Sequence, residues 1–84
     1  MKVVIYGKDQ CVFCKRAKQL VEERDVDNEY IDIIETGLGK EGLEKIVGGP
    51  VTSVPQIFVD DVHVGGYTDL VSYLNKPNKP EVEE

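Results

Sequence analysis

The sequence predicts one α/β domain in which a four-stranded mixed sheet is packed with three helices, in the order β-α-β-α-β-β-α. Three observations predict this class: short β-branched runs typical of strands, helical spacing between the first two of them, and a tight Asp60-Asp61 turn between the last two. A helical crossover implies a parallel pair of strands, and a tight turn forces an antiparallel pair. The chain of 84 residues is long enough for one such domain and no more.

The first half of the chain predicts a strand, a helix and a second strand. Residues 3–6 are apolar and β-branched, which indicates a strand buried on both faces. From Cys11 to about Arg24 the apolar residues follow the spacing of one helix face. The apolar face of this helix, between the two strands, is formed by Phe13, Ala17, Leu20 and Val21. Residues 30–34 predict the second strand.

The second half predicts a short helix, a hairpin and a last helix. Residues 43–47 have helical spacing and are followed at 48–50 by Gly-Gly-Pro, which is typical of a helix end. Residues 55–59 and 62–64 predict the two strands of the hairpin. The apolar residues of segment 67–75 fit a last helix.

Composition limits the organisation and location of the protein. We expect the domain to span residues 1–76, followed by a flexible acidic tail at 77–84. The chain has no apolar run long enough to cross a membrane and no signal-peptide pattern, so we expect a cytoplasmic location. The net charge of −6 argues against nucleic acid as a partner. Residues 1–24 nevertheless carry six basic and three acidic residues, so the end with the cysteines is basic.

Cys11 and Cys14 are the residues most indicative of chemistry. A bridge across so short a loop stabilises little, so the pair is better explained by redox chemistry than by a structural role, although an inert structural pair remains the alternative. We expect Cys11 to begin the helix, where unpaired N–H groups and the helix dipole favour a thiolate. Cys14, one turn later, should be more buried. Cys11 is therefore predicted to attack and Cys14 to resolve the mixed disulfide.

A zinc site is not expected. A structural zinc ion needs four ligands, and the chain offers two cysteines and the single histidine His63, far along the sequence. Basic residues near Cys11 would add to the positive field around its sulfur; these are Lys8, Lys15 and Arg16.

Three segments resemble motifs of the glutaredoxin family, in the family's order. Residues 11–14 (CVFC) resemble its Cys-Pro-Tyr-Cys active site, residues 53–59 (SVPQIFV) its Thr-Val-Pro-Gln-Ile-Phe-Val segment, and residues 65–70 (GGYTDL) its Gly-Gly motif. The resemblance implies a thioredoxin-like fold and glutathione-dependent reduction of protein disulfides and glutathione mixed disulfides. Val12 and Phe13 depart from the family's Pro and Tyr, and these two differences bear on the redox potential and the partner preference.

The resemblance also implies a glutathione site. Pro55 would be a cis-proline facing the cysteines, and Val54 would pair with the glutathione backbone as an added strand. Thr68 and Asp69 would hold the γ-glutamyl end, although both are also good helix caps. Lys8, with Gln56 as a second candidate, would hold the glycyl carboxylate. The implied set is Lys8, Phe13, Ser53, Val54, Pro55, Gly66, Tyr67, Thr68 and Asp69.

The resemblance further implies a monomer with no tightly bound cofactor and with glutathione as reductant. Its partners would be disulfide-bearing or glutathionylated proteins, with ribonucleotide reductase as one candidate. Two alternatives remain open. One is a redoxin reduced by thioredoxin reductase that donates electrons to ribonucleotide reductase, since such proteins often carry Cys-Val-x-Cys. The other is a dimer that bridges an iron–sulfur cluster through Cys11 and glutathione.

Overall fold

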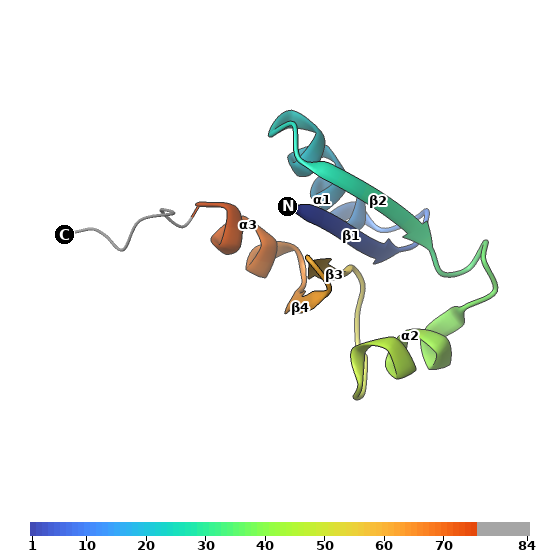
Figure 1. Ribbon diagram of the computed structural model, residues 1–84. Helices are drawn as coiled ribbons and strands as arrows, with labels where there is room; N and C mark the ends of the chain where they lie inside the picture. Colours follow the sequence, from blue (N-terminus) through green and yellow to red (C-terminus); the bar gives the residue numbers. More distant parts are fainter. Residues whose placement is uncertain (76–84) are drawn as a thin grey trace.

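The computed structural model describes residues 1–75 and contains seven elements around one sheet (Figure 1). Their order, β-α-β-α-β-β-α, confirms the predicted class. The predicted acidic tail at 77–84 lies outside the described residues. In chain order the elements are β1 (Lys2–Gly7), α1 (Val12–Glu23), β2 (Asp27–Asp32), α2 (Gly39–Val47), β3 (Gln56–Val59), β4 (Val62–Gly65) and α3 (Tyr67–Asn75).

The sheet is mixed, as predicted, and its strand order is β2-β1-β3-β4. Strand β1 pairs in parallel with β2 and antiparallel with β3, and β3 pairs antiparallel with β4. The β3–β4 turn has positive φ at both Asp60 and Asp61, 50° and 70°. A two-residue hairpin with positive φ at both central positions matches the twist of the flanking strands. The tight turn is thus the reason that β4 lies beside β3.

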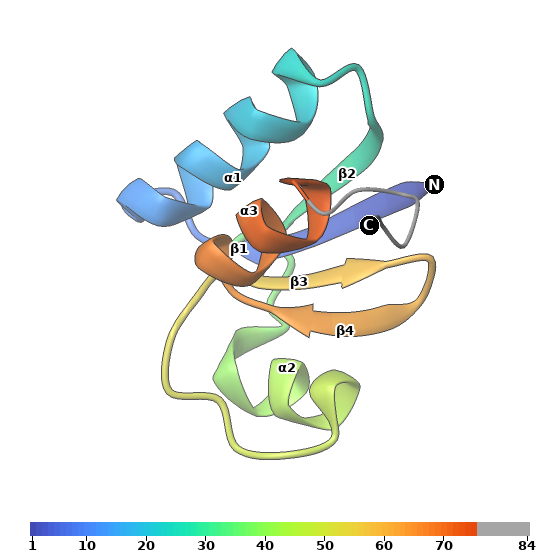
Figure 2. The ribbon, with the colours of Figure 1, turned by 90° about the vertical axis from the view of Figure 1, so that its left-hand side faces the viewer.

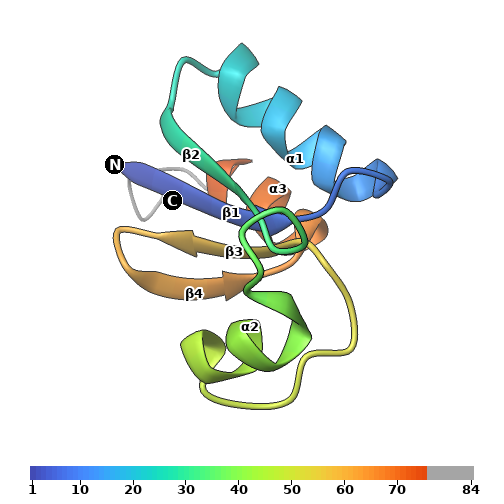
Figure 3. The ribbon, with the colours of Figure 1, turned by 90° about the vertical axis from the view of Figure 1, so that its right-hand side faces the viewer.

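Helices α1 and α3 cover one face of the sheet, and α2 lies on the other (Figures 2 and 3). The larger core fills the space between the sheet and helices α1 and α3, because alternate strand residues point to this face. Its buried members are Val3, Ile5, Ala17, Val21, Ile57, Val59 and Leu70.

The α2 face holds a smaller core, which corrects one sequence expectation. Strand β1 was predicted to be buried on both faces, but Val4 and Tyr6 are only half-buried. The reason is that a single short helix covers this side and supplies one fully buried side chain, Leu43. Tyr6 and Val54 pack against the cluster that Leu43 forms. This cluster supports the segment before β3 from behind.

Strand β2 begins and ends earlier than the predicted 30–34. Parallel pairing with β1 brings Asp27 opposite Lys2. Polar residues thereby become part of the strand, although the spacing of apolar residues does not indicate them. The strand ends at Asp32, whose carboxylate accepts the N–H groups of Ile34 and Glu35 at 2.8 and 2.9 Å and so turns the chain. The chain leaves the sheet here and passes to α2.

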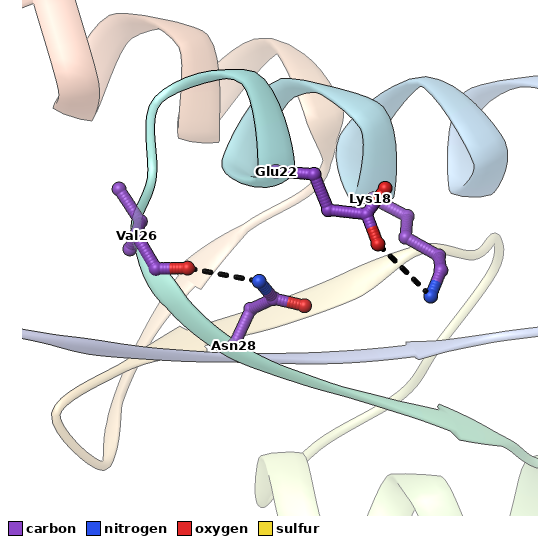
Figure 4. A network of polar contacts seen from close by, with 4 residues as sticks. All are labelled: Lys18, Glu22, Val26 and Asn28. Atoms are coloured by element: carbon purple, nitrogen blue, oxygen red, sulfur yellow. Dashed lines mark hydrogen bonds and ion pairs between the residues drawn. The ribbon is translucent and has the colours of Figure 1, made fainter.

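Figure 4 shows two polar contacts, one on α1 and one at the start of β2. Lys18 and Glu22, one turn apart, form an ion pair of 3.3 Å. The side-chain amide of Asn28 donates to the carbonyl of Val26 at 2.8 Å, close to the start of β2. The exposed ion pair stabilises the helix by about 0.5 kcal/mol or less. Within residues 1–75, no helix combines the length and apolar composition that a membrane span requires.

Candidate active site

Cys11 is the N-cap residue of α1. Its backbone is extended (φ −121°, ψ 114°), and its sulfur accepts a hydrogen bond from the backbone N–H of Cys14 at 3.2 Å. An N-cap side chain normally uses an oxygen to satisfy one of the unpaired first-turn N–H groups, and here a sulfur does so. Val12 follows as the first helical residue, 63% exposed. The helix start that the sequence predicted for Cys11 is therefore present, and one first-turn amide, that of Cys14, donates to the sulfur.

Cys14 lies one turn further, with no exposed surface. Burial raises the pKa of its thiol from 9.0 to about 12, and a hydrogen bond with Cys11 adds to the rise. Hydrogen bonds from the Lys8 backbone and the Tyr30 side chain act in the opposite direction. Both cysteines are free thiols. The two sulfurs thus occupy different environments: one is partly exposed at a helix end and the other is enclosed.

The segment before β3 faces Cys11. The Val54–Pro55 peptide bond is cis, as the family resemblance implied for Pro55. The Cys11 thiol donates to the carbonyl of Val54 at 3.5 Å, although 43 residues separate them in the chain. The tertiary structure therefore brings the first and second sequence motifs into contact.

The start of α3 completes the site. The carboxylate of Asp69 accepts the backbone N–H of Gly66 at 3.0 Å. The carbonyl of Gly66 accepts the backbone N–H of Leu70 at 3.0 Å, as the N-cap residue of α3 does. This is one half of a capping box, so Asp69 does act as a cap. Gly65 has φ +124°, and a Cβ there would collide with the Asp69 carboxylate. Glycine is needed at this position for both reasons.

A groove of about 560 Å³ runs between these three segments. Phe13 and Tyr67 both line it and form an aromatic pair with ring centroids 5.8 Å apart, and the guanidinium of Arg16 lies 5.6 Å from the Phe13 ring centre. Eight of the nine residues predicted to bind glutathione line this groove. Its lining residues are Phe13, Ser53, Val54, Pro55, Gln56, Gly65, Gly66, Tyr67, Thr68 and Asp69.

Lys8 is the ninth predicted residue and lies outside this groove. It lines an adjoining pocket of about 250 Å³, which it shares with Ser53 and Val54. Gln56, the second candidate for the glycyl carboxylate, donates its amide to the carbonyl of Ser53 at 2.8 Å, and its side-chain oxygen lies 2.7 Å from a ring nitrogen of His63. The two candidates therefore line different pockets, and both pockets include Ser53 and Val54.

Tyr30 is the residue near the cysteines that sequence reasoning missed. In the sequence it is one residue of an apolar strand, and nothing marks its hydroxyl as special. In the structure the hydroxyl donates to the carbonyl of Lys8 at 3.1 Å and interacts with Cys14. Within residues 1–75, no three His, Cys, Asp or Glu side chains gather as they would to hold a metal ion.

A mixed sheet with a Cys-x-x-Cys pair at the start of its first helix and a cis-proline facing the pair defines a thioredoxin-like thiol–disulfide oxidoreductase. Comparison with known proteins gives the family. The glutaredoxin family profile matches residues 3–64. Glutaredoxin 1 of Salmonella typhimurium is 51% identical over 81 residues, covering 90% of this chain and 93% of the relative. Glutaredoxin 1 of Escherichia coli is 46% identical over 81 residues, covering 90% and 95%.

A solved structure agrees with these sequences. Reduced Escherichia coli glutaredoxin superposes with a TM-score of 0.77 at 44% identity, covering 88% of this chain and 93% of that one. The chain belongs to the glutaredoxin family. It is a glutathione-dependent disulfide oxidoreductase whose active site contains Cys11 and Cys14.

Proposed function

We propose that Cys11 is the attacking sulfur, that Cys14 is the resolving sulfur, and that glutathione binds in the groove beside them. One observation carries this assignment: Cys11 is partly exposed at the end of α1, whereas Cys14, one turn later, has no exposed surface. A substrate disulfide can reach only the first of these sulfurs. First-turn N–H groups and the helix dipole stabilise the negative charge that an attacking thiolate carries.

The reaction with a protein disulfide proceeds by thiol–disulfide exchange. The Cys11 thiolate attacks one substrate sulfur, the substrate disulfide bond breaks, and the departing sulfur takes up a proton. Cys14 then attacks the Cys11 sulfur and releases the second substrate thiol, leaving a Cys11–Cys14 disulfide. One glutathione opens this bond as a mixed disulfide on Cys11, and a second glutathione removes the first as oxidised glutathione. Glutathione mixed disulfides need Cys11 alone.

The groove has suitable groups for each part of glutathione. The backbone of Val54 can pair with the cysteinyl residue as an added strand, next to the sulfur of Cys11. The first turn of α3 can receive the γ-glutamyl carboxylate, while Asp69 pairs with its ammonium group. Lys8 lines the neighbouring pocket together with Ser53 and Val54, and from there it can meet the glycyl carboxylate. Four further residues would line the bound peptide: Phe13, Gly66, Tyr67 and Thr68.

Glutathione would thus act as a co-substrate, with no tightly bound cofactor and with the protein as a monomer. Its partners would be disulfide-bearing or glutathionylated proteins, of which ribonucleotide reductase is one candidate. We place this cycle in the cytoplasm, because the glutathione pool there keeps thiols reduced.

The test is the reduction of a small glutathione mixed disulfide and of a protein disulfide, with wild type, Cys11→Ser and Cys14→Ser. We expect Cys11→Ser to lose both activities and Cys14→Ser to lose only the second. A parallel assay replaces glutathione with NADPH and thioredoxin reductase, and should give little turnover. Equal loss of activity in both variants would contradict the roles assigned to the two cysteines. Turnover with thioredoxin reductase but not with glutathione would contradict the proposal that glutathione is the reductant.

A further inference from the structure

We propose that the hydroxyl of Tyr30 stabilises the sulfur of Cys14 while that sulfur acts as a nucleophile, and so speeds closure of the Cys11–Cys14 disulfide. The inference rests on the resolving role proposed above for Cys14. It adds to the site a residue from β2, which none of the three sequence motifs contains.

The geometry around Gly7 places the two groups together. A Cβ added at Gly7 would lie 2.5 Å from the hydroxyl oxygen of Tyr30 and 2.7 Å from the sulfur of Cys14. The hydroxyl of Tyr30 and the sulfur of Cys14 therefore lie on either side of the position that a Cβ of residue 7 would occupy. This position is empty because residue 7 is glycine. The Tyr30 ring packs against the larger core, which holds the hydroxyl in this position.

Cys14 needs such a group because its own surroundings oppose ionisation. It is fully enclosed, and burial raises the pKa of its thiol to about 12. Only the thiolate attacks a disulfide, so the small ionised fraction at neutral pH limits the rate of closure. Hydrogen-bond donors directed at this sulfur raise that fraction, and two residues supply them: Lys8 through its backbone and Tyr30 through its side chain.

Tyr30 stays able to donate at neutral pH. Burial, together with the nearby Cys14, raises the pKa of its phenol, so the hydroxyl keeps its proton. In the reduced protein this proton is directed to the carbonyl of Lys8 at 3.1 Å, which leaves the oxygen lone pairs available to the Cys14 thiol. When Cys14 ionises, rotation about the C–O bond can direct the same proton to the sulfur.

The step itself is a balanced exchange. Cys14 loses its proton to solvent, its sulfur forms a bond to the sulfur of Cys11, and the bond from Cys11 to glutathione breaks. The glutathione thiolate takes up a proton and leaves. One disulfide is consumed and one is formed, and Tyr30 ends with the proton with which it began.

Rapid mixing of the reduced protein with oxidised glutathione, followed by acid quench and mass spectrometry, separates the two steps. The first produces the glutathione adduct of Cys11, and the second converts the adduct to the internal disulfide. The variant is Tyr30→Phe, which keeps the ring and removes the hydroxyl. Tyr73→Phe, the same change on the exposed side of α3, is the matched control. Cys14→Ser marks the adduct, because its reaction stops there.

We expect Tyr30→Phe to form the adduct at the wild-type rate and to close it about tenfold more slowly or worse, the effect of losing a hydrogen bond to a charged group. Tyr73→Phe should match wild type in both steps. Closure at the wild-type rate in Tyr30→Phe would overturn the inference, as would equal slowing of both steps. If the wild-type adduct never closes, the resolving role of Cys14 itself is wrong, a failure that wild type alone reveals.

Discussion

The backbone N–H of Cys14 donates a hydrogen bond to the sulfur of Cys11 across 3.2 Å, so the side chain of Cys11 is itself the N-cap of α1. The same sulfur therefore has a structural role at the helix end and belongs to the active site.

The two roles of Cys11 can be separated by substitution. Serine is a good N-cap, whereas alanine offers no acceptor, so Cys11→Ala should lower the free energy of unfolding by about 1 kcal/mol and Cys11→Ser should not. Both variants should lack disulfide reductase activity. Urea unfolding of the reduced proteins measures the difference. A Cys11→Ala variant as stable as wild type would mean that the sulfur contributes nothing as a cap.

Asp69 combines capping and proposed glutathione binding in a similar way. Asp69→Ala removes the acceptor for the N–H of Gly66 and should cost about 1 kcal/mol of stability. Asp69→Asn keeps an acceptor oxygen and should be close to wild type in stability, yet both variants should raise the KM for glutathione because the ammonium group loses its carboxylate partner. An unchanged KM in Asp69→Asn would remove Asp69 from the glutathione site.

Gly7 should not tolerate a larger side chain. A Cβ there would lie 2.7 Å from the Cys14 sulfur and 2.9 Å from its Cβ, and Cys14 is fully buried. We expect Gly7→Ala to lower the free energy of unfolding by about 1–3 kcal/mol. Gly49→Ala is the control, since a Cβ at Gly49 would meet nothing within 4 Å. A loss of stability in Gly49→Ala as large as in Gly7→Ala would contradict this explanation.

The reduced protein should lose stability in alkali. The pKa of Cys14 is 9.0 in an unfolded chain and about 12 in the folded protein, so the stabilisation associated with its proton is complete below pH 9 and falls as the pH rises towards 12. The raised pKa of Tyr30 acts in the same direction. Urea midpoints at pH 7, 9 and 10.5 measure this loss. The oxidised protein, whose Cys14 has no proton to lose, should decline less, and an equal decline would count against Cys14 as the cause.

Local patterns determined much of the fold. The Asp60-Asp61 turn was predictable from the sequence, because two residues in left-handed conformation suffice to close a hairpin. The helical spacing after Cys11 predicted α1 and its start. The sequence predicted the ends of a strand less well where they depend on pairing with another strand. Strand β2 begins at Asp27 because β1 offers a parallel partner, and no property of the polar segment itself reveals that partner.

The site shows the same division. The sequence by itself determined that a reactive cysteine begins a helix and that a second follows one turn later, because capping and helix periodicity are local. It also determined, through the resemblance of three motifs, which residues should meet. Only the tertiary structure decided that the carbonyl of Val54 accepts a hydrogen bond from Cys11, that Lys8 is separated from the main groove, and that the hydroxyl of Tyr30 flanks Cys14. These contacts join residues distant in the chain, and they exist only once the sheet has paired and the helices have packed on it.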